Sequence, residues 1–225
     1  HVEPNMGNIS ANKSIKYTSQ ELNSLATSLG GRMRGLFLAS PGMALVGTDA
    51  EGIQLRIFAH LMNDQAFVKS LIEGKKEDGT DPHSINQRIL NALSRDDAKT
   101  FIYAFLLGAG IGKIKSILKQ TTTQATQAKE SFIQAYPGLK LLKETIIPRD
   151  ADRGYFIGLD GRFVVCSSEH LMLAGYLQNA EACIMKHANI LWRDRLDAMG
   201  IYYRQVNFVH DEWQTECHPE HAELV

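Results

Sequence analysis

The sequence predicts a mixed α+β fold, in which an antiparallel sheet is joined to a larger and mainly helical part. Two stretches have the pattern of strands: ALVGTD, which is short and apolar, and VNFVHDEWQTEC, which alternates around a tight turn. Between them, residues 94–150 and 168–199 are mostly helical in character. The sheet would therefore be assembled from strands that lie far apart in the sequence.

Size and composition exclude several classes of protein. The chain has 225 residues, 44% of them hydrophobic, and a net charge of −1, which suits one large or two small domains. No apolar run could cross a bilayer, and the N-terminal residues lack the apolar stretch of a signal peptide. The near-neutral charge argues against nucleic-acid binding by bulk charge alone. Three widely spaced cysteines, without zinc-site spacing, are expected to be reduced thiols. Because the first residue is not Met, we expect a segment of a longer protein.

The first 43 residues are expected to be irregular and then helical, and the first strand follows them. Asp49 stands where the strand ALVGTD becomes the helix IQLRIFAHLM, whose apolar residues recur at helical spacing. An acid at the end of a strand can reach a cleft while the strand itself stays packed. Residues 63–93 then predict a helix, a polar surface loop EGKKEDGTDP, and a further segment DPHSINQRI.

The next helix, within residues 94–112, carries a stripe of polar groups. Ser94 and Asp97 have the spacing of a capping box at its start. Arg95, Lys99 and Tyr103 recur every four residues, a step that drifts by only about 40° around a helix. Two cations followed by a ring suit a triphosphate with a base attached. Three glycines are expected to end the helix: Gly108, Gly110 and Gly112.

The second half of the chain is predicted to be helical up to a hairpin, then helical again. Pro137 and Gly138 interrupt the helical pattern of residues 113–150, and residues 147–167 are expected to form a β-hairpin around LDG. Residues 168–199 predict a long helix that ends at Gly200. Its buried stripe is expected at Leu173, Leu177, Ala180, Ile184, His187 and Leu191.

Three of these stretches together resemble family A DNA polymerases, the group related to bacterial DNA polymerase I. RDDAKTFIYAFLLGAG is similar to the fingers-helix run RDxAKTFIYGFLxGAG of the phage-type branch. DAEGIQLR resembles the first palm motif, DxSxxELR, and HDE resembles the second carboxylate motif, in the same order along the chain. The resemblance implies a right-hand palm, an antiparallel sheet flanked by helices, with a mainly helical fingers subdomain. It also implies a nucleotidyltransferase that adds deoxynucleotides to a primer 3′-hydroxyl during DNA replication.

The resemblance covers nearly the whole chain and implies its division. Residues 1–62 and 151–225 would be the two parts of the palm, and residues 63–150 the fingers, with the thumb and exonuclease domains absent. The implied partners are primer-template DNA and deoxynucleoside triphosphates, with replication accessory proteins as further candidates and no membrane. The implied location is the cytoplasm, that of a phage-infected bacterium.

The implied catalytic residues are the acids of the two palm motifs. Asp49 and Asp211 would hold two Mg²⁺ ions, together with the backbone carbonyl of Ala50, and Glu212 would support them. Carboxylates from two different elements must hold such a pair of metal ions. Both aspartates stand at strand ends, which suits two adjacent strands that present both acids to one cleft.

The implied nucleotide site combines the fingers stripe with two further residues. His83, from a segment similar to the family's D-I-H-T, would join Arg95 and Lys99 on the triphosphate. Tyr103 would lie on the sugar and base, and its hydroxyl implies tolerance of nucleotides that lack the 3′-hydroxyl. Gln54 stands where the family has a glutamate that excludes a ribose 2′-hydroxyl. A glutamine has nearly the same shape, so this steric gate could survive without the charge.

The implied primer-template contacts come from segments along the whole chain. PNMGNIS resembles PNLQNIP, GGRMRGLF resembles GRRIRQAF, and GLDGRF resembles TLDGRR. LQNAEACIMK resembles LQSAGALICK or MQGTAADIIK. The residues assigned to DNA in this way are Asn5, Asn8, Arg34, Arg162, Gln178 and His210.

Two further departures from the family leave other functions open. Leu107 replaces a tyrosine that closes over the template position, and Ala174 replaces an asparagine that contacts the template. A single-subunit RNA polymerase would carry Gly at the gate and HDS at the second acid motif, and Gln54 and HDE argue against it. A catalytically inactive nucleic-acid-binding module is the other alternative, and both metal-binding acids argue against that.

Overall fold

The computed structural model describes residues 38–166 and 168–225, which divide into two compact units. One, here called the sheet unit, contains described residues 38–49 and 190–225. The other, the helical unit, contains residues 50–189. These boundaries reflect packing, and the division into palm and fingers at residues 62 and 150 stays a prediction. In the described part of the chain, no helix has the length and apolar character needed to span a membrane.

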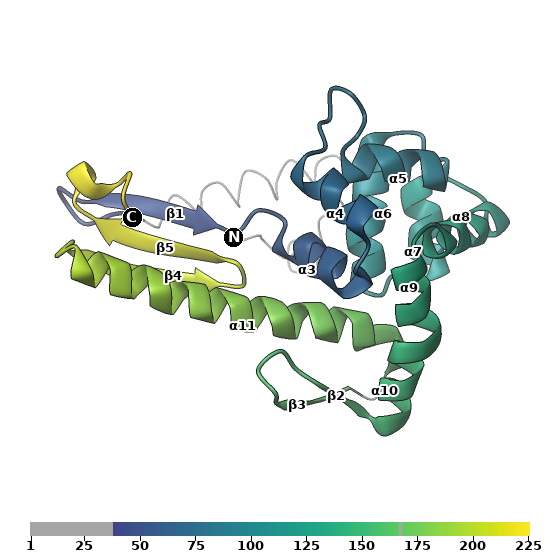
Figure 1. The fold of residues 1–225 in the computed structure, drawn as a ribbon. Coiled ribbons are helices and arrows are strands. Elements are labelled where there is room, and N and C mark those ends of the chain that lie inside the picture. The colour runs from purple at the N-terminus through teal and green to yellow at the C-terminus, as the bar shows by residue number, and fades with distance from the viewer. Residues whose placement is uncertain (1–37, 167) are drawn as a thin grey trace, which may run out of the picture. The chain divides into compact units, whose positions relative to one another are not determined.

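The sheet unit is built on three antiparallel strands (Figure 1). They are β1 (Ala44–Asp49), β4 (Tyr203–Val209) and β5 (Glu212–Cys217), in the order β1-β5-β4. Trp213 of the central strand packs on Trp192, with ring centroids 5.4 Å apart, and Trp192 also contacts Tyr203 at 5.1 Å. The predicted hairpin is confirmed, and the first strand pairs with its second arm.

The helical unit consists mainly of short helices (Figure 1). These helices pack around a cluster of aromatic side chains in which neighbouring ring centroids lie 5.1–6.0 Å apart: Phe58, Phe67, Phe101, Phe105, Phe132 and Tyr136. The helices are α3 (Ile53–Met62), α4 (Gln65–Ile72), α5 (Pro82–Leu90), α6 (Arg95–Leu106), α7 (Ile111–Leu118), α8 (Thr122–Ala135), α9 (Pro137–Leu141), the π-helical turn η1 (Leu142–Ile146) and α10 (Ile147–Arg153). Strands β2 (Tyr155–Ile157) and β3 (Phe163–Val165) follow, and α11 (Glu169–Ala198) continues into the sheet unit.

Helix α6 begins where its sequence predicts. The Ser94 hydroxyl accepts a hydrogen bond from the Asp97 amide at 3.0 Å, which caps the helix start. The helix ends at Leu106, and Gly108 takes a left-handed conformation with φ of 78°. The prediction that three glycines end this helix is wrong for two of them, because Gly110 caps the start of α7 and Gly112 lies within it.

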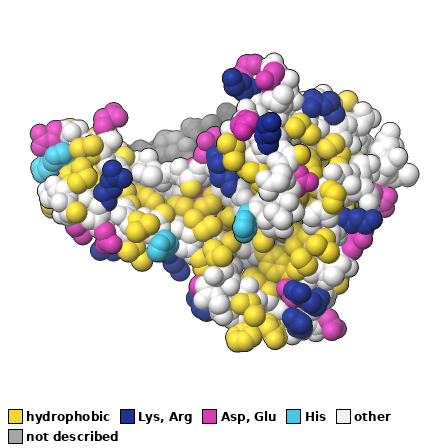
Figure 2. Space-filling model, viewed as in Figure 1, with side chains coloured by type: hydrophobic (Ala, Val, Ile, Leu, Met, Phe, Trp, Pro, Cys, Tyr) yellow, Lys and Arg dark blue, Asp and Glu magenta, His cyan; other side chains and the backbone are white. Residues whose placement is uncertain are grey.

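The predicted hairpin at residues 147–167 is shorter than expected. Residues 147–153 form α10 instead of a strand, since Pro148 is well tolerated in the first turn of a helix and Gly154, with φ of 76°, ends it. Only β2 and β3 pair. Figure 2 shows hydrophobic side chains gathered at this hairpin, near the bottom of the view, where Phe163 and Val165 are 71% and 83% exposed.

Helix α11 has its buried face in a different phase from the predicted one. Beyond Leu177, every fourth residue is buried: Glu181 and Met185 are each 4% exposed. Ile184 and Leu191, predicted to be buried, are 39% and 57% exposed. The apolar pattern of the sequence does not indicate the buried carboxylate at position 181, because a glutamate is polar. Gly200 follows the helix with φ of 67°, as predicted.

Candidate active site

Three carboxyl groups meet at one end of the sheet. Asp49, the last residue of β1, stands directly opposite Glu212, the first residue of β5, and Asp211 precedes Glu212 in the turn. His210 takes φ of 56°, a left-handed conformation that lets the chain reverse between β4 and β5. Burial and then the neighbouring charges of Asp211 and Glu212 raise the pKa of Asp49. The sheet therefore brings the predicted catalytic acids together.

These acids suit a cation whose coordination is completed by other ligands. Besides burial, the negative charges of Asp211 and Glu212 raise the pKa of Asp49, and a divalent cation would neutralise the charge that gathers there. The Glu212 carboxylate accepts a hydrogen bond from the Gln214 amide, so it already has a protein partner. No three His, Cys, Asp or Glu side chains of the described residues have the geometry of a complete metal centre. A cation here would therefore need further oxygen ligands, such as a backbone carbonyl or phosphate.

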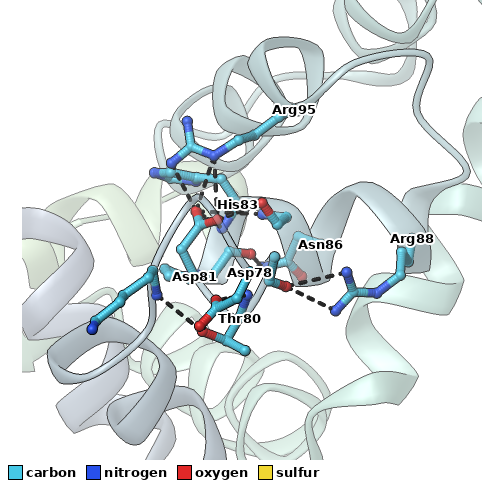
Figure 3. Close-up of polar contacts among 11 residues, drawn as sticks. Asp78, Thr80, Asp81, His83, Asn86, Arg88 and Arg95 are labelled. Carbon is cyan, nitrogen blue, oxygen red and sulfur yellow. Dashed lines mark hydrogen bonds and ion pairs between the residues drawn. The ribbon is translucent and has the colours of Figure 1, made fainter.

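In the helical unit, Arg95 is held by Asp81 (Figure 3). Two guanidinium nitrogens of Arg95 donate to the Asp81 carboxylate, at 2.7 Å from Nη2 and 3.1 Å from Nε. Asp81 also caps α5, where it accepts from the backbone amide of His83 and the hydroxyl of Ser84. Burial alone would raise the pKa of Asp81, but the hydrogen bonds from Arg95 and Ser84 outweigh it and lower the pKa to about 2. The guanidinium is thus fixed over the start of α5.

His83 lies buried beside this pair. Its side chain is 8% exposed, and its ring centroid is 6.3 Å from that of Tyr103. Among the described residues, its Nδ1 atom has no hydrogen-bond partner. Burial and then the positive charge of Arg95 lower the pKa of His83, and Lys99 acts in the same direction. A buried imidazole with an unsatisfied nitrogen, close to two cations, suits an anionic ligand.

The predicted stripe on α6 is therefore one side of a larger cluster, here called the α5–α6 cluster: His83, Arg95, Lys99 and Tyr103. Lys99 is exposed one turn after Arg95, and Tyr103 is half-buried one turn further. Sequence spacing could predict the stripe but not Asp81, which holds its first cation. A signal for Asp81 was present, since an aspartate directly before Pro82 is typical of a helix N-cap.

Gln54 on α3 has a partner that was not predicted. Its Nε2 atom donates to the Glu181 carboxylate of α11 at 2.7 Å. Gln54 is half-buried and Glu181 is only 4% exposed. Gly52 lies two residues before Gln54, and a Cβ added to Gly52 would lie 3.9 Å from the Tyr103 hydroxyl. The residue that precedes α3 thus lies close to the Tyr103 hydroxyl.

Of the predicted DNA-contacting residues, the structure describes Arg162, Gln178 and His210. Asn5, Asn8 and Arg34 lie outside the described residues. Arg162 is exposed in the turn of the β2–β3 hairpin and forms an ion pair with Asp160. Gln178 on α11 and His210 in the β4–β5 turn are both exposed. Their assignment to primer and template stays a prediction.

Comparison with known proteins identifies the family. The model of DNA polymerase family A matches residues 1–225. The DNA-directed DNA polymerase of Escherichia phage T7 is 31% identical, over 77% of this chain and 27% of its own length. The corresponding enzyme of Enterobacteria phage T3 is 30% identical over the same shares. The thermostable DNA polymerase I of Thermus aquaticus is 28% identical, over 88% of this chain and 26% of its own.

The fold has a counterpart among solved structures. The POL domain of Pol1 from M. smegmatis, in a complex with DNA primer-template and dNTP, matches with a TM-score of 0.73 at 21% identity. The match covers 87% of this chain and 37% of that one. This chain spans about a quarter of the length of the phage and Thermus relatives. The match of the family model along the whole sequence shows that the chain belongs to DNA polymerase family A.

Proposed function

We propose that the protein containing this chain is a template-directed DNA polymerase, which adds deoxynucleotides to a primer 3′-hydroxyl in DNA replication. The observation that carries the proposal is the meeting of Asp49, Asp211 and Glu212 at one end of the β1–β5 strand pair. Phosphoryl transfer needs carboxylates from separate elements at one place, because the attacking and leaving oxygens both develop charge. The names of the phage relatives support the same reaction.

The acids at the sheet end are proposed to hold two Mg²⁺ ions. Asp49, Asp211 and the backbone carbonyl of Ala50 would be their protein ligands, and Glu212 would hold a supporting position. When bound, the ions would neutralise charge on the phosphates and lower the pKa of the primer hydroxyl. The closeness of the three acids supports this assignment, as does the general use of divalent metal ions by polymerases of this family.

The α5–α6 cluster is proposed to bind the incoming triphosphate. Arg95 and Lys99 would stabilise the charge of the departing pyrophosphate, and His83 would donate from its ring to a phosphate oxygen. Asp81 would keep the guanidinium of Arg95 in one orientation before the nucleotide arrives. Tyr103 would stack on the sugar and base.

Primer-template DNA is the proposed partner of the whole protein. The neighbour from M. smegmatis is a complex with DNA primer-template and dNTP, which supports DNA and nucleotides as partners here. Arg162, Gln178 and His210 are proposed to contact the DNA. Replication accessory proteins are candidate partners, and the phage relatives favour a role in the cytoplasm of an infected bacterium.

Primer extension with Mg²⁺ tests this function. The protein that contains this chain should add the deoxynucleotide complementary to the template, and Asp211→Ala should lower the rate by at least about 100-fold. Asp197→Ala is the matched control, because Asp197 is an exposed acid of the same unit on α11, and its rate should stay unchanged. Extension that survives Asp211→Ala would contradict the proposal. Binding of primer-template without any extension would favour the inactive binding module.

A further inference from the structure

A buried carboxylate with no role in the proposed reaction lies next to Gln54. Glu181 is 4% exposed and belongs to the buried face of α11, where Leu177 and Met185 stand one turn before and after it. Removing a carboxylate from water is costly unless hydrogen bonds or a cation compensate. None of the ion pairs among the described residues involves Glu181, and its hydrogen bond from Gln54, at 2.7 Å, provides compensation.

This hydrogen bond fixes the orientation of the side-chain amide of Gln54. The amide carries an NH₂ group that donates and an oxygen that accepts, and only the NH₂ group can pair with a carboxylate. With Nε2 directed at Glu181, Oε1 is turned away from that carboxylate. A glutamine without such a partner could turn over and present NH₂ instead. Glu181 therefore holds the Gln54 side chain in one position and one orientation.

The neighbourhood of Gln54 is the place where nucleotide sugars would be sorted. Gly52, two residues earlier, lies close to the hydroxyl of Tyr103, which is assigned to the sugar and base. A gate of this kind excludes a 2′-hydroxyl by filling the space beside the sugar, and a side chain that is held in place keeps that space closed, whereas a free side chain turns aside. We propose that Glu181 is a positioning residue that holds Gln54 so that the pair, and not Gln54 alone, excludes ribonucleotides.

The charge missing from position 54 is thus carried on a neighbouring helix. The segments that resemble this part of α11, LQSAGALICK and MQGTAADIIK, have Gly or Ala where this chain has Glu181. The same chain has glutamine where the resembling palm motif has glutamate. Relative to these motifs, the carboxylate therefore stands at position 181 and not at position 54, and the two side chains touch in the structure although they lie 127 residues apart in sequence.

The inference rests on the proposed polymerase function, and an exchange of the two side chains tests it. The measurement is the ratio of kcat/KM for a deoxynucleotide to that for the matching ribonucleotide, with the protein that contains this chain. Glu181→Gln should lower the ratio by about tenfold, the effect of one charged hydrogen bond, with a smaller change for the deoxynucleotide. The double variant Gln54→Glu with Glu181→Gln restores one acid and one amide, and its ratio should return to within about threefold of the unaltered protein.

Two further variants separate positioning from folding. Glu181→Asp keeps the charge but withdraws it from the amide, and it should also lower the ratio, which keeps the test decisive if Glu181→Gln does not fold. Glu130→Gln, at an exposed position on α8, should leave the ratio and both rates unchanged. A purely structural role for Glu181 would lower the use of both nucleotides together, with the ratio unaltered, and this outcome overturns the inference alone. Absence of any extension by the unaltered protein overturns the proposed function and the inference with it.

Discussion

The ion pair of Asp81 and Arg95 makes a specific contribution to stability that Asp81→Asn would remove. The substitution keeps the size of the side chain and part of its capping of α5, but it removes the charge that two guanidinium nitrogens contact. The side chain of Asp81 is 8% exposed and that of Arg95 is 26% exposed, so solvent screens the pair only weakly. The loss should therefore exceed that of an ordinary surface ion pair.

Its magnitude follows from the pKa of Asp81, which is about 2 in the folded protein against an ordinary 3.8. A group whose pKa is lowered by folding stabilises the fold above its unfolded pKa and loses that effect as the pH falls through the folded pKa. The difference corresponds to about 2 kcal/mol of unfolding free energy at neutral pH. About half of this should remain at pH 3, and little at pH 2.

Urea unfolding followed by circular dichroism measures this difference. Asp81→Asn should lose about 2 kcal/mol at pH 7 and progressively less below pH 4. Asp96→Asn is the matched control, because Asp96 is an exposed acid in the first turn of α6, and it should lose no more than about 1 kcal/mol. An equal loss for Asp81→Asn at pH 7 and pH 2.5 would refute the electrostatic origin.

Two other predictions concern nucleotide binding and packing. Burial and Arg95 lower the pKa of His83, and a bound triphosphate would favour its protonated form, so nucleotide affinity should rise as the pH falls from 8 to 6. Calorimetry should show this slope disappear in His83→Asn, and a slope that persists would assign it to another group. An added Cβ at Gly138 would lie 1.7 Å from the backbone oxygen of Met62, so Gly138→Ala should destabilise the protein by about 1–3 kcal/mol in thermal unfolding. Gly112→Ala, at the second position of α7 with open space around it, should be neutral or slightly stabilising, and equal effects of both would contradict this packing argument.

Much of the sheet could be predicted from sequence because its signals are local. Alternation around a tight turn defines β4 and β5, and an apolar run before a helix defines β1. Asp49 and Asp211 both stand at strand ends, and antiparallel pairing of β1 with β5 is enough to bring them together. The phase of a long helix was harder to predict, since α11 carries apolar residues on several faces and only packing selects the one that is buried.

The side-chain partners could not be predicted, because each depends on the packing of two elements. Asp81 and Arg95 belong to the starts of α5 and α6, and neither spacing nor composition indicates how closely those starts approach. Gln54 and Glu181 belong to α3 and α11. Each residue alone has an ordinary interpretation, as a helix cap, a basic stripe, a replaced glutamate and a polar position on a helix. The structure shows each of these residues in contact with a partner that the sequence does not indicate.

Single-turnover extension at increasing Mg²⁺ concentration tests most directly whether the acids at the end of the β1–β5 strand pair carry nucleotide transfer. Asp49→Asn and Asp211→Asn should each lower the maximal rate by at least about 100-fold, while binding of primer-template is retained. A rate that either variant leaves within about threefold of the unaltered protein, at the same Mg²⁺ concentration, would contradict the claim and place the transfer at other residues.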